Sequence, residues 1–215
     1  MSYLIHSIFH TVQGEGQHAG TPAIFIRFAG CNVWSGREAD RGKATAKGIC
    51  AAWCDTEFSG TTETGGRFTL DELLERLSQE EDGPVPPIIV MTGGEPSLQV
   101  DRLLVVALKL LGWRVHIETN GSRELPEEID WVTLSPKPPM PVVIERADEL
   151  KCVWPDVDPF YWRGLVPAGR VFLQPRDDND GDELRAIQWA ETLSYVVENP
   201  WCRISLQTHK LLGIE

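Results

Sequence analysis

The sequence predicts an α/β fold built on a mainly parallel sheet, either open or curled into a partial barrel, with helices outside it. Short apolar, β-branched runs alternate with helical patterns along most of the chain, and most of these runs have the composition of buried parallel strands. The chain has 215 residues and no linker, internal repeat or low-complexity tract. We therefore expect residues 1–215 to form a single domain.

Seven runs qualify as strands because each is short, apolar and rich in β-branched residues. In chain order they are residues 24–28, 88–92, 115–119, 131–135, 150–153, 171–174 and 203–207.

Three stretches have helical patterns. Leu70–Ser78 follows Thr69 and has Glu72 at the spacing of a capping box. Residues 100–111 are apolar at helical spacing and end at a glycine, and residues 182–199 form the longest candidate, ended by a proline. Seven prolines between positions 134 and 170 exclude a long helix there, so we expect short crossovers that leave one face of the sheet thinly covered.

Composition excludes several classes of function. The net charge is −12 and no run of Lys or Arg occurs, so the basic surface that nucleic acids require is absent. No stretch approaches the eighteen apolar residues of a membrane span, and the first residues lack the basic flank and apolar run of an export signal. We expect a cytoplasmic protein, in which five cysteines, an odd number, favour reduced thiols or metal over disulfides.

Three of these cysteines stand close together. Cys50 follows Cys31 after eighteen residues, and Cys54 follows after three more. Three thiolates on a four-iron cluster leave one iron open for chemistry, whereas a closed zinc site needs a fourth ligand that is missing at the usual spacing. Spacing alone leaves three possibilities open: a three-thiolate cluster, a zinc site, or cysteines without metal. Cys152 and Cys202 lie in apolar, strand-like settings and are expected in the core.

Polar motifs follow four consecutive strand candidates. They are residues 92–96 (Thr-Gly-Gly-Glu-Pro), 118–121 (Glu-Thr-Asn-Gly), 135–137 (Ser-Pro-Lys) and 174–177 (Gln-Pro-Arg-Asp). Ligands of parallel α/β sheets bind at the carboxyl ends of the strands, so these motifs predict a site on that rim. Each motif taken singly is more often a plain turn or strand terminator, and their joint placement favours the site.

Several motifs together resemble the radical S-adenosylmethionine superfamily: residues 28–32 (Phe-Ala-Gly-Cys-Asn), 53–56 (Trp-Cys-Asp-Thr) and 92–96. Residues 12–16 (Val-Gln-Gly-Glu-Gly), Arg27, residues 118–121 and 135–137, and residues 207–210 (Gln-Thr-His-Lys) narrow the resemblance to the 7-carboxy-7-deazaguanine synthase family. The ordered set runs from about residue 5 to the last residue. The resemblance implies an abridged partial (β/α) barrel of the radical SAM type, with some crossover helices shortened or lost.

The chain departs from the superfamily at one place. The cluster cysteines of the superfamily usually follow a C-x3-C-x2-C pattern. In this chain Ser35 stands at the position of the second cysteine. An insert of residues 36–49 then delivers Cys50, which we assign as the second ligand because some members of the family carry such an insert. The gap from Cys50 to Cys54 is one residue longer than usual, so the loop must bulge. The basic residues of the insert, Arg37, Arg41, Lys43 and Lys47, are open to two interpretations, docking of an acidic reductase or simple solvation.

The resemblance also implies a reaction and its parts. A 4Fe-4S cluster on Cys31, Cys50 and Cys54 cleaves S-adenosylmethionine reductively, and 6-carboxy-5,6,7,8-tetrahydropterin is converted to 7-carboxy-7-deazaguanine with loss of ammonia. Thr56 resembles the Mg²⁺ ligand of these enzymes, although from sequence alone such a threonine is more often a loop or capping residue. A homodimer and a flavodoxin-like or other electron donor are the implied partners.

Roles carry over residue by residue from the resemblance. The implied contacts of S-adenosylmethionine are Trp53, Cys54, Asp55, Gly94, Glu95, Ser135, Pro136, Lys137, Gln174, Pro175, Arg176 and Asp177. The implied contacts of the pterin substrate are Val12, Gln13, Gly14, Glu15, Arg27, Thr92, His209 and Glu215. The guanidinium of Arg27 suits the substrate carboxylate, and the amide and carboxylate of residues 13 and 15 suit its aminopyrimidinone edge.

Two rival functions stay open. Another radical S-adenosylmethionine enzyme, such as a glycyl-radical activase, would share the cysteines and residues 92–96 but would not need residues 13–16 or Arg27 as clamps for a small molecule. A zinc-stabilised, non-catalytic binding module belongs to a different class, and metal content separates it from both.

Overall fold

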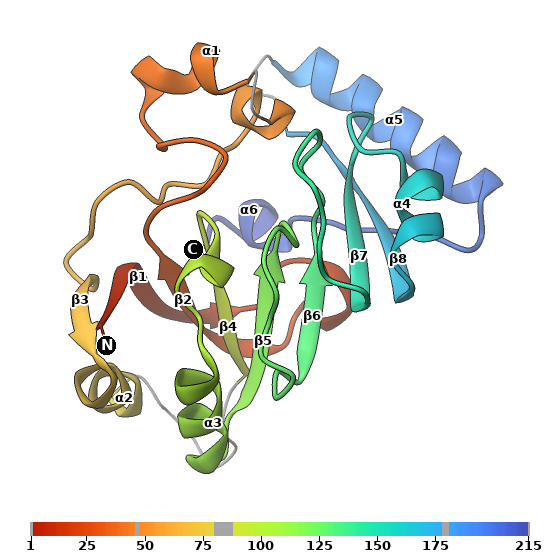
Figure 1. Cartoon of the computed structure of the whole chain (residues 1–215). Helices are drawn as coiled ribbons and strands as arrows, with labels where there is room; N and C mark the ends of the chain where they lie inside the picture. The colour runs from red at the N-terminus through yellow and green to blue at the C-terminus, as the bar shows by residue number, and fades with distance from the viewer. Residues whose placement is uncertain (1, 46–47, 80–87, 178–180, 215) are drawn as a thin grey trace.

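The computed structural model describes residues 2–45, 48–79, 88–177 and 181–214, and in this part of the chain it shows a nine-stranded sheet (Figure 1). The strands are β1 (Ser2–Val12), β2 (Pro22–Phe28), β3 (Gly66–Thr69), β4 (Ile88–Gly93), β5 (Arg114–Thr119), β6 (Trp131–Leu134), β7 (Ala147–Trp154), β8 (Ala168–Pro175) and β9 (Arg203–Ile204). Their order in the sheet is β3-β1-β2-β4-β5-β6-β7-β8-β9.

Most neighbouring strands are parallel, as the sequence predicts. β1 pairs antiparallel with β2 and with β3, and every pair from β2 to β9 is parallel. Parallel strands place their carboxyl ends at the same edge, so the polar motifs that follow β4, β5, β6 and β8 gather on one rim.

The helices are α1 (Arg41–Ala44), α2 (Leu70–Ser78), α3 (Arg102–Leu110), α4 (Pro159–Leu165), α5 (Asp182–Glu198) and α6 (Thr208–Leu212), with 3₁₀ turns η1 (Gly16–His18), η2 (Glu38–Asp40), η3 (Ile49–Ala52) and η4 (Pro96–Leu98). Figure 1 shows α2 and α3 toward one end of the row of strands, α4 and α5 toward the other, and α6 near the middle.

The three expected helices are present as α2, α3 and α5. Thr69 and Glu72 form the reciprocal capping box predicted for α2. The proline-rich region contains only the short α4 among its described helices, in line with the expected short crossovers. The expectation that Pro159 breaks a helix was wrong: Pro159 begins α4, because the first turn of a helix needs no N–H from its proline.

Two strands were not anticipated, β1 and β3. A register shift between Ile5 and Ser7 interrupts the pairing of β1 with β2. His6 and Ser7 are nevertheless buried, so the simple alternation of apolar and polar residues that marks a strand is lost at this point.

The sheet has an apolar face and a face that becomes polar toward its carboxyl edge. On the first, Ile89, Met91 and Ile117 pack with α3 in the main core. On the second, Ile88 and Val90 pack with Ala23 and Phe25 of β2, and polar side chains follow toward the edge. We call this second side the pocket face; it carries Arg27, Thr92, Glu118, Lys151 and Gln174.

Among the described residues, no helix combines the length and the apolar character needed to cross a membrane.

Candidate active site at the carboxyl edge of the sheet

A cavity of about 350 Å³ opens on the pocket face. Its walls come from segments far apart in the chain: the end of β1, the cysteine loops, and the ends of β2, β4, β5, β7 and β8, with α6 completing the rim. The parallel strands bring these segments together, so the site is assembled by the sheet topology.

The two glycines after β4 are required by close backbone packing. A side chain on Gly93 would lie 2.2 Å from the carbonyl oxygen of Phe28, and one on Gly94 would lie 2.1 Å from that of Gly30. The φ of Gly93 is also +130°, which other residues rarely adopt. The amide of Glu95 then donates to the Gly30 carbonyl at 2.9 Å, which joins the end of β4 to the start of the cysteine loop.

Glu95 organises the neighbouring strand end. Its side chain is only 1% exposed and accepts hydrogen bonds from the Thr119 hydroxyl at 2.6 Å, the Asn120 amide at 2.8 Å and the Ser97 amide at 3.1 Å. Asn120 in turn donates to the side chain of Asn32, next to Cys31. The motifs after β2, β4 and β5 are therefore one hydrogen-bonded unit.

Cys31, Cys50 and Cys54 all line the cavity. Cys50 is buried in a small core with Trp34, Ala51 and Phe58, and Cys31 and Cys54 pack against that core. The extra residue between Cys50 and Cys54 is taken up by η3, a tight turn that buries Ala51 completely. Ser35 does not line the cavity, and its hydroxyl donates to Asp40 at 2.6 Å.

Burial changes the protonation of two of the three thiols. Burial raises the pKa of Cys31 and raises the pKa of Cys50 to about 11, so neutral thiols are favoured until a metal replaces the protons. Among the described residues, no group of three His, Cys, Asp or Glu side chains is placed to hold a single metal ion. A four-iron cluster is larger than one ion and takes each thiolate at a separate corner, which three cysteines around one cavity can supply.

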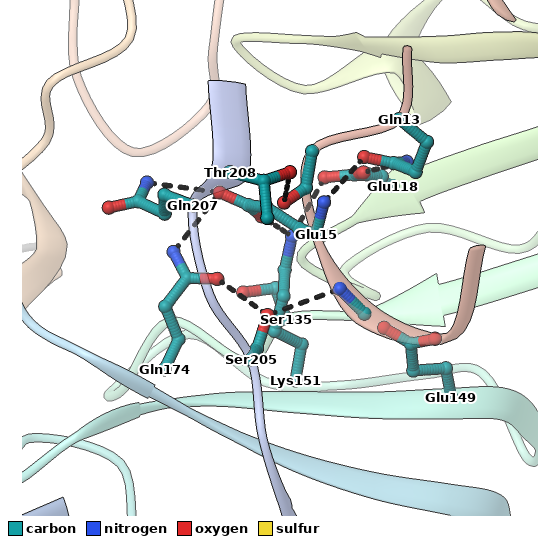
Figure 2. Close-up of polar contacts among 12 residues, drawn as sticks. Gln13, Glu15, Glu118, Ser135, Glu149, Lys151, Gln174, Ser205, Gln207 and Thr208 are labelled. Carbon is teal, nitrogen blue, oxygen red and sulfur yellow. Dashed lines mark hydrogen bonds and ion pairs between the residues drawn. The ribbon is translucent and has the colours of Figure 1, made fainter. Parts of the chain in front are cut away.

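A buried lysine forms the polar floor of the cavity (Figure 2). Lys151 donates to Glu15 and, at 2.9 Å, to Glu118; its side chain is 6% exposed. Burial alone would lower the pKa of Lys151, but Glu118 and Glu15 raise it above its usual value. Burial likewise acts to raise the pKa of Glu118, yet Lys151 and the Gln13 amide hold it below its usual value. The floor therefore holds a charged cluster.

Amide side chains extend this floor. The amide of Gln13 donates to Glu118 at 3.0 Å, and those of Gln174 and Gln207 donate to Glu15 at 3.2 and 3.0 Å. Figure 2 shows the side chains of Gln174 and Gln207 directed at Glu15, and that of Gln13 directed at Glu118. Such fixed donors and acceptors can orient a flat heterocycle by its polar edge.

Glu149 lies beneath Gly16 and Gln17, on the same side of β7 as Lys151. It is 3% exposed, and its carboxylate accepts from the Gln17 amide at 2.9 Å. Burial raises the pKa of Glu149 to about 7. A side chain on Gly16 would come within 1.9 Å of this carboxylate, and the φ of Gly16 is +64°, so only glycine fits here.

The wall near β1 and β2 combines aromatic rings with a cation. Phe9 and Phe25 stack with ring centroids 5.3 Å apart, and the guanidinium of Arg27 lies 5.1 Å from the Phe9 centroid. α6 is attached opposite this wall: the Thr208 amide and hydroxyl both donate to the Gly14 carbonyl at 2.9 Å. A side chain on Gly14 would collide with the His209 ring at 2.1 Å, so this glycine admits the imidazole to the cavity.

The wall near the cysteines contains two lysines. Lys137 donates to the Ser135 hydroxyl at 2.6 Å, and its ammonium lies 5.6 Å from the centroid of the Trp53 ring. Lys210, on α6, joins Asp55 of the cysteine loop to Asp177 beyond β8, the latter at 2.7 Å. The C-terminal helix is thus tied to both sides of the cavity mouth.

Most residues implied by the resemblance line this cavity. On the cofactor side they are Trp53, Cys54, Asp55, Gly94, Glu95, Ser135, Lys137 and Gln174, with Cys31, Cys50 and Thr56; on the substrate side they are Val12, Gln13, Gly14, Glu15, Arg27, Thr92 and His209.

Four described residues of the expected set do not line it: Pro136, Pro175, Arg176 and Asp177. Arg176 pairs with Asp156 at 2.8 Å, and Asp177 reaches the rim only through Lys210. Glu215 and the insert residue Lys47 lie outside the described residues.

The sequence analysis did not identify Lys151 as a site residue, and it assigned Glu118 no role beyond the motif at residues 118–121. The sequence did contain a signal for Lys151. A strand buried on both sides is apolar throughout, whereas this strand has charged residues at positions 149 and 151 with an apolar residue between them. Lys210 was also missed as a cavity residue, although it belongs to the motif at residues 207–210. Cys152 and Cys202 lie in the second core, as expected.

Comparisons with known proteins agree with this arrangement. No protein-family model matches the chain. The chain is 44% identical over 222 residues to the 7-carboxy-7-deazaguanine synthase of Bradyrhizobium diazoefficiens and 42% identical over 218 residues to that of Caulobacter vibrioides, with all of both chains covered in each case. It is also similar to the crystal structure of QueE from Escherichia coli, with a TM-score of 0.70 and 27% identity over 95% of this chain and 93% of that one.

Proposed function

The chain belongs to the 7-carboxy-7-deazaguanine synthase family, and from that premise we propose that it converts 6-carboxy-5,6,7,8-tetrahydropterin to 7-carboxy-7-deazaguanine with loss of ammonia, as a radical S-adenosylmethionine lyase. One observation supports this proposal most strongly. Three cysteines, the loop after β4 and the Lys151 floor surround a single cavity, so a cluster side and a substrate side face each other.

On the cluster side, Cys31, Cys50 and Cys54 would hold a 4Fe-4S cluster, and Ser35 would not take part. When bound, the cluster and S-adenosylmethionine supply the one-electron chemistry that starts the reaction. Gly94 with Glu95, the backbone near Trp53 and Asp55, Ser135 with Lys137, and Gln174 would border S-adenosylmethionine. Gly94 lines the cavity, and Lys137 adds a cation for the carboxylate of the cofactor.

On the substrate side, Arg27 would bind the substrate carboxylate through its guanidinium, which lies over the Phe9 ring. Gln13, Glu15 and Glu118 would receive the aminopyrimidinone edge, with their oxygens held in place by Lys151 and the surrounding amides. Gly14, Thr92 and His209 would close the pocket around the ring.

The remaining parts are proposals from the family resemblance. Thr56, which lines the cavity beside the cysteine loop, would contribute a hydroxyl to Mg²⁺, with substrate oxygens and water as the other ligands. Pro136, Pro175, Arg176 and Asp177 adjoin the cavity residues Ser135, Lys137 and Gln174 and would belong to the loops that contact S-adenosylmethionine. Glu215 would lie near the substrate. We also propose one domain over residues 1–215, a homodimer, a flavodoxin-like or other electron donor, and a cytoplasmic location.

A direct assay tests the proposed reaction. The protein, reconstituted anaerobically with iron and sulfide, is incubated with a reductant, S-adenosylmethionine and the carboxylated tetrahydropterin. We expect 7-carboxy-7-deazaguanine, detected by mass, together with cleaved S-adenosylmethionine. Cleavage of S-adenosylmethionine without this product would favour another radical enzyme such as a glycyl-radical activase, and colourless protein carrying stoichiometric zinc would favour the binding module.

A further inference from the structure

The insert at residues 36–49 is joined to the cysteine loop by the side chain of Arg41. One terminal nitrogen of its guanidinium, Nη1, donates to the carbonyl oxygen of Ala51 at 2.7 Å and to that of Cys54 at 3.2 Å. Both carbonyls belong to the loop that runs from Cys50 to Cys54. The sequence alone suggests that Arg41 either docks an acidic reductase or is solvated. Its side chain instead points into the protein and is only 26% exposed.

Other contacts fix the orientation of this guanidinium. Its central carbon lies 4.5 Å from the centroid of the Trp34 ring, which is itself 6% exposed. Its Nε donates to both carboxylate oxygens of Glu38 at 2.9 Å. A planar guanidinium can stack, pair and donate at the same time, which the ammonium of a lysine cannot do.

The loop has a specific need for such donors. η3 is a short 3₁₀ turn, and the last carbonyls of a helical turn lack partners within it. The gap between Cys50 and Cys54 also holds one residue more than the usual family spacing, so the loop has more conformational freedom to lose. Ala44 of α1 packs in the same small core as Cys50 and Ala51, so the insert supports this loop by packing as well.

We propose that Arg41 is a positioning residue for the iron-sulfur cluster: it fixes the turn between Cys50 and Cys54 and so holds two of the three thiols in ligating positions. The proposal rests on the cluster assigned above. It gives the insert a function inside its own chain, which is to supply both the replacement cysteine and the arginine that braces it.

The test compares R41Q with a matched control, K43Q, which removes the same charge from an exposed position on the same helix. Each protein is reconstituted anaerobically, and the loss of cluster absorbance in the presence of an iron chelator is followed without substrate. We expect R41Q to lose iron at least roughly 10-fold faster than the wild type, because mutation of residues that orient metal ligands typically weakens metal binding by such a factor. K43Q should lose iron at the wild-type rate. The electron paramagnetic resonance spectrum of the reduced cluster should change in R41Q alone.

Equal rates for R41Q and the wild type would overturn the proposal, and so would equal acceleration in R41Q and K43Q, which would indicate a general effect of charge. If R41Q does not fold, R41K is measured in the same way. R41K keeps the charge but loses the planar fork, so wild-type retention in R41K would also overturn the proposal. Failure of wild-type protein to bind iron would instead refute the cluster itself, and the two failures are therefore distinguishable.

Discussion

At the scale of single residues, the site depends on polar groups that are buried and mutually satisfied. Lys151 is the clearest example, because it lies on the floor of the cavity between two carboxylates and its side chain is only 6% exposed. A charge in such a position is tolerated only when it is paired and hydrogen-bonded. Its partners, Glu15 and Glu118, come from segments more than a hundred residues apart in the chain. Sequence alone could identify an unusual lysine there but could not identify its partners.

We predict that K151M strongly destabilises the protein and abolishes product formation. Removing the lysine leaves its two partner carboxylates as uncompensated buried charges, which lowers the free energy of unfolding by about 3–5 kcal/mol. Urea denaturation measures this cost. The control is K109M, which breaks the more exposed pair with Asp130 and should cost at most about 1 kcal/mol. Similar losses in the two variants would show that the Lys151 cluster has no special role.

Glu149 should make stability depend on pH. Its pKa is raised from 4.5 to about 7 in the folded protein, so the folded state binds the proton more tightly than the unfolded chain does. The stability that this proton contributes is present at low pH and is lost as pH rises through the folded-state value. Relative to E149Q, the wild type should therefore lose stability between about pH 5 and pH 8, by roughly 3 kcal/mol at most.

Urea denaturation of both proteins across this pH range measures the difference. E149Q is a suitable reference because an amide oxygen can still accept from Gln17 and carries no charge. A constant difference between the two proteins across the range would mean that Glu149 does not take up a proton on folding.

At the scale of secondary structure, the sequence predicts the parallel strands and the long helices well. β4, β5 and β8 are apolar runs bounded by turn residues, and α2 carries a complete capping box. β1 could not be predicted in the same way because its register shift disturbs the alternation of side chains. α6 spans only five residues, Thr208–Leu212, and is held by tertiary contacts to Gly14 and to two aspartates, which no local pattern reveals.

We predict that K210A weakens binding of S-adenosylmethionine by loosening α6 from the cysteine loop. Lys210 joins Asp55 and Asp177 across the cavity mouth, and partly exposed pairs of this kind contribute up to about 1 kcal/mol, which corresponds to roughly fivefold in affinity. Equilibrium titration of the reconstituted protein with S-adenosylmethionine measures the effect. L211A, an exposed neighbour on the same helix, is the control and should bind as the wild type does. Unchanged affinity in K210A would separate α6 from the cofactor site.

At the scale of the whole molecule, topology assembles the site. The motifs are spread from residue 12 to residue 210, and the parallel sheet brings their strand ends to one rim. The sequence could predict this convergence because parallel strands share a carboxyl edge. It could not predict the links within it, such as Glu95 with Asn120, since these depend on side-chain directions in three dimensions.

The chain carries a net charge of −12, whereas Arg27, Lys137, Lys151 and Lys210 all line the cavity. The same cavity is lined by Glu15, Asp55, Glu57, Glu95 and Glu118, and Lys151 and Lys210 pair with three of these carboxylates. The cavity therefore presents charges of both signs, which suits a substrate that carries both a carboxylate and polar ring edges.

In the proposed site, the insert delivers a cluster ligand, Cys50, in place of Ser35. Iron and sulfide content of C50A after anaerobic reconstitution tests it most directly, with C152A as the control because Cys152 lies in the core away from the cavity. We expect about four irons per chain in the wild type and in C152A, and a large loss in C50A. A complete and active cluster in C50A would contradict it.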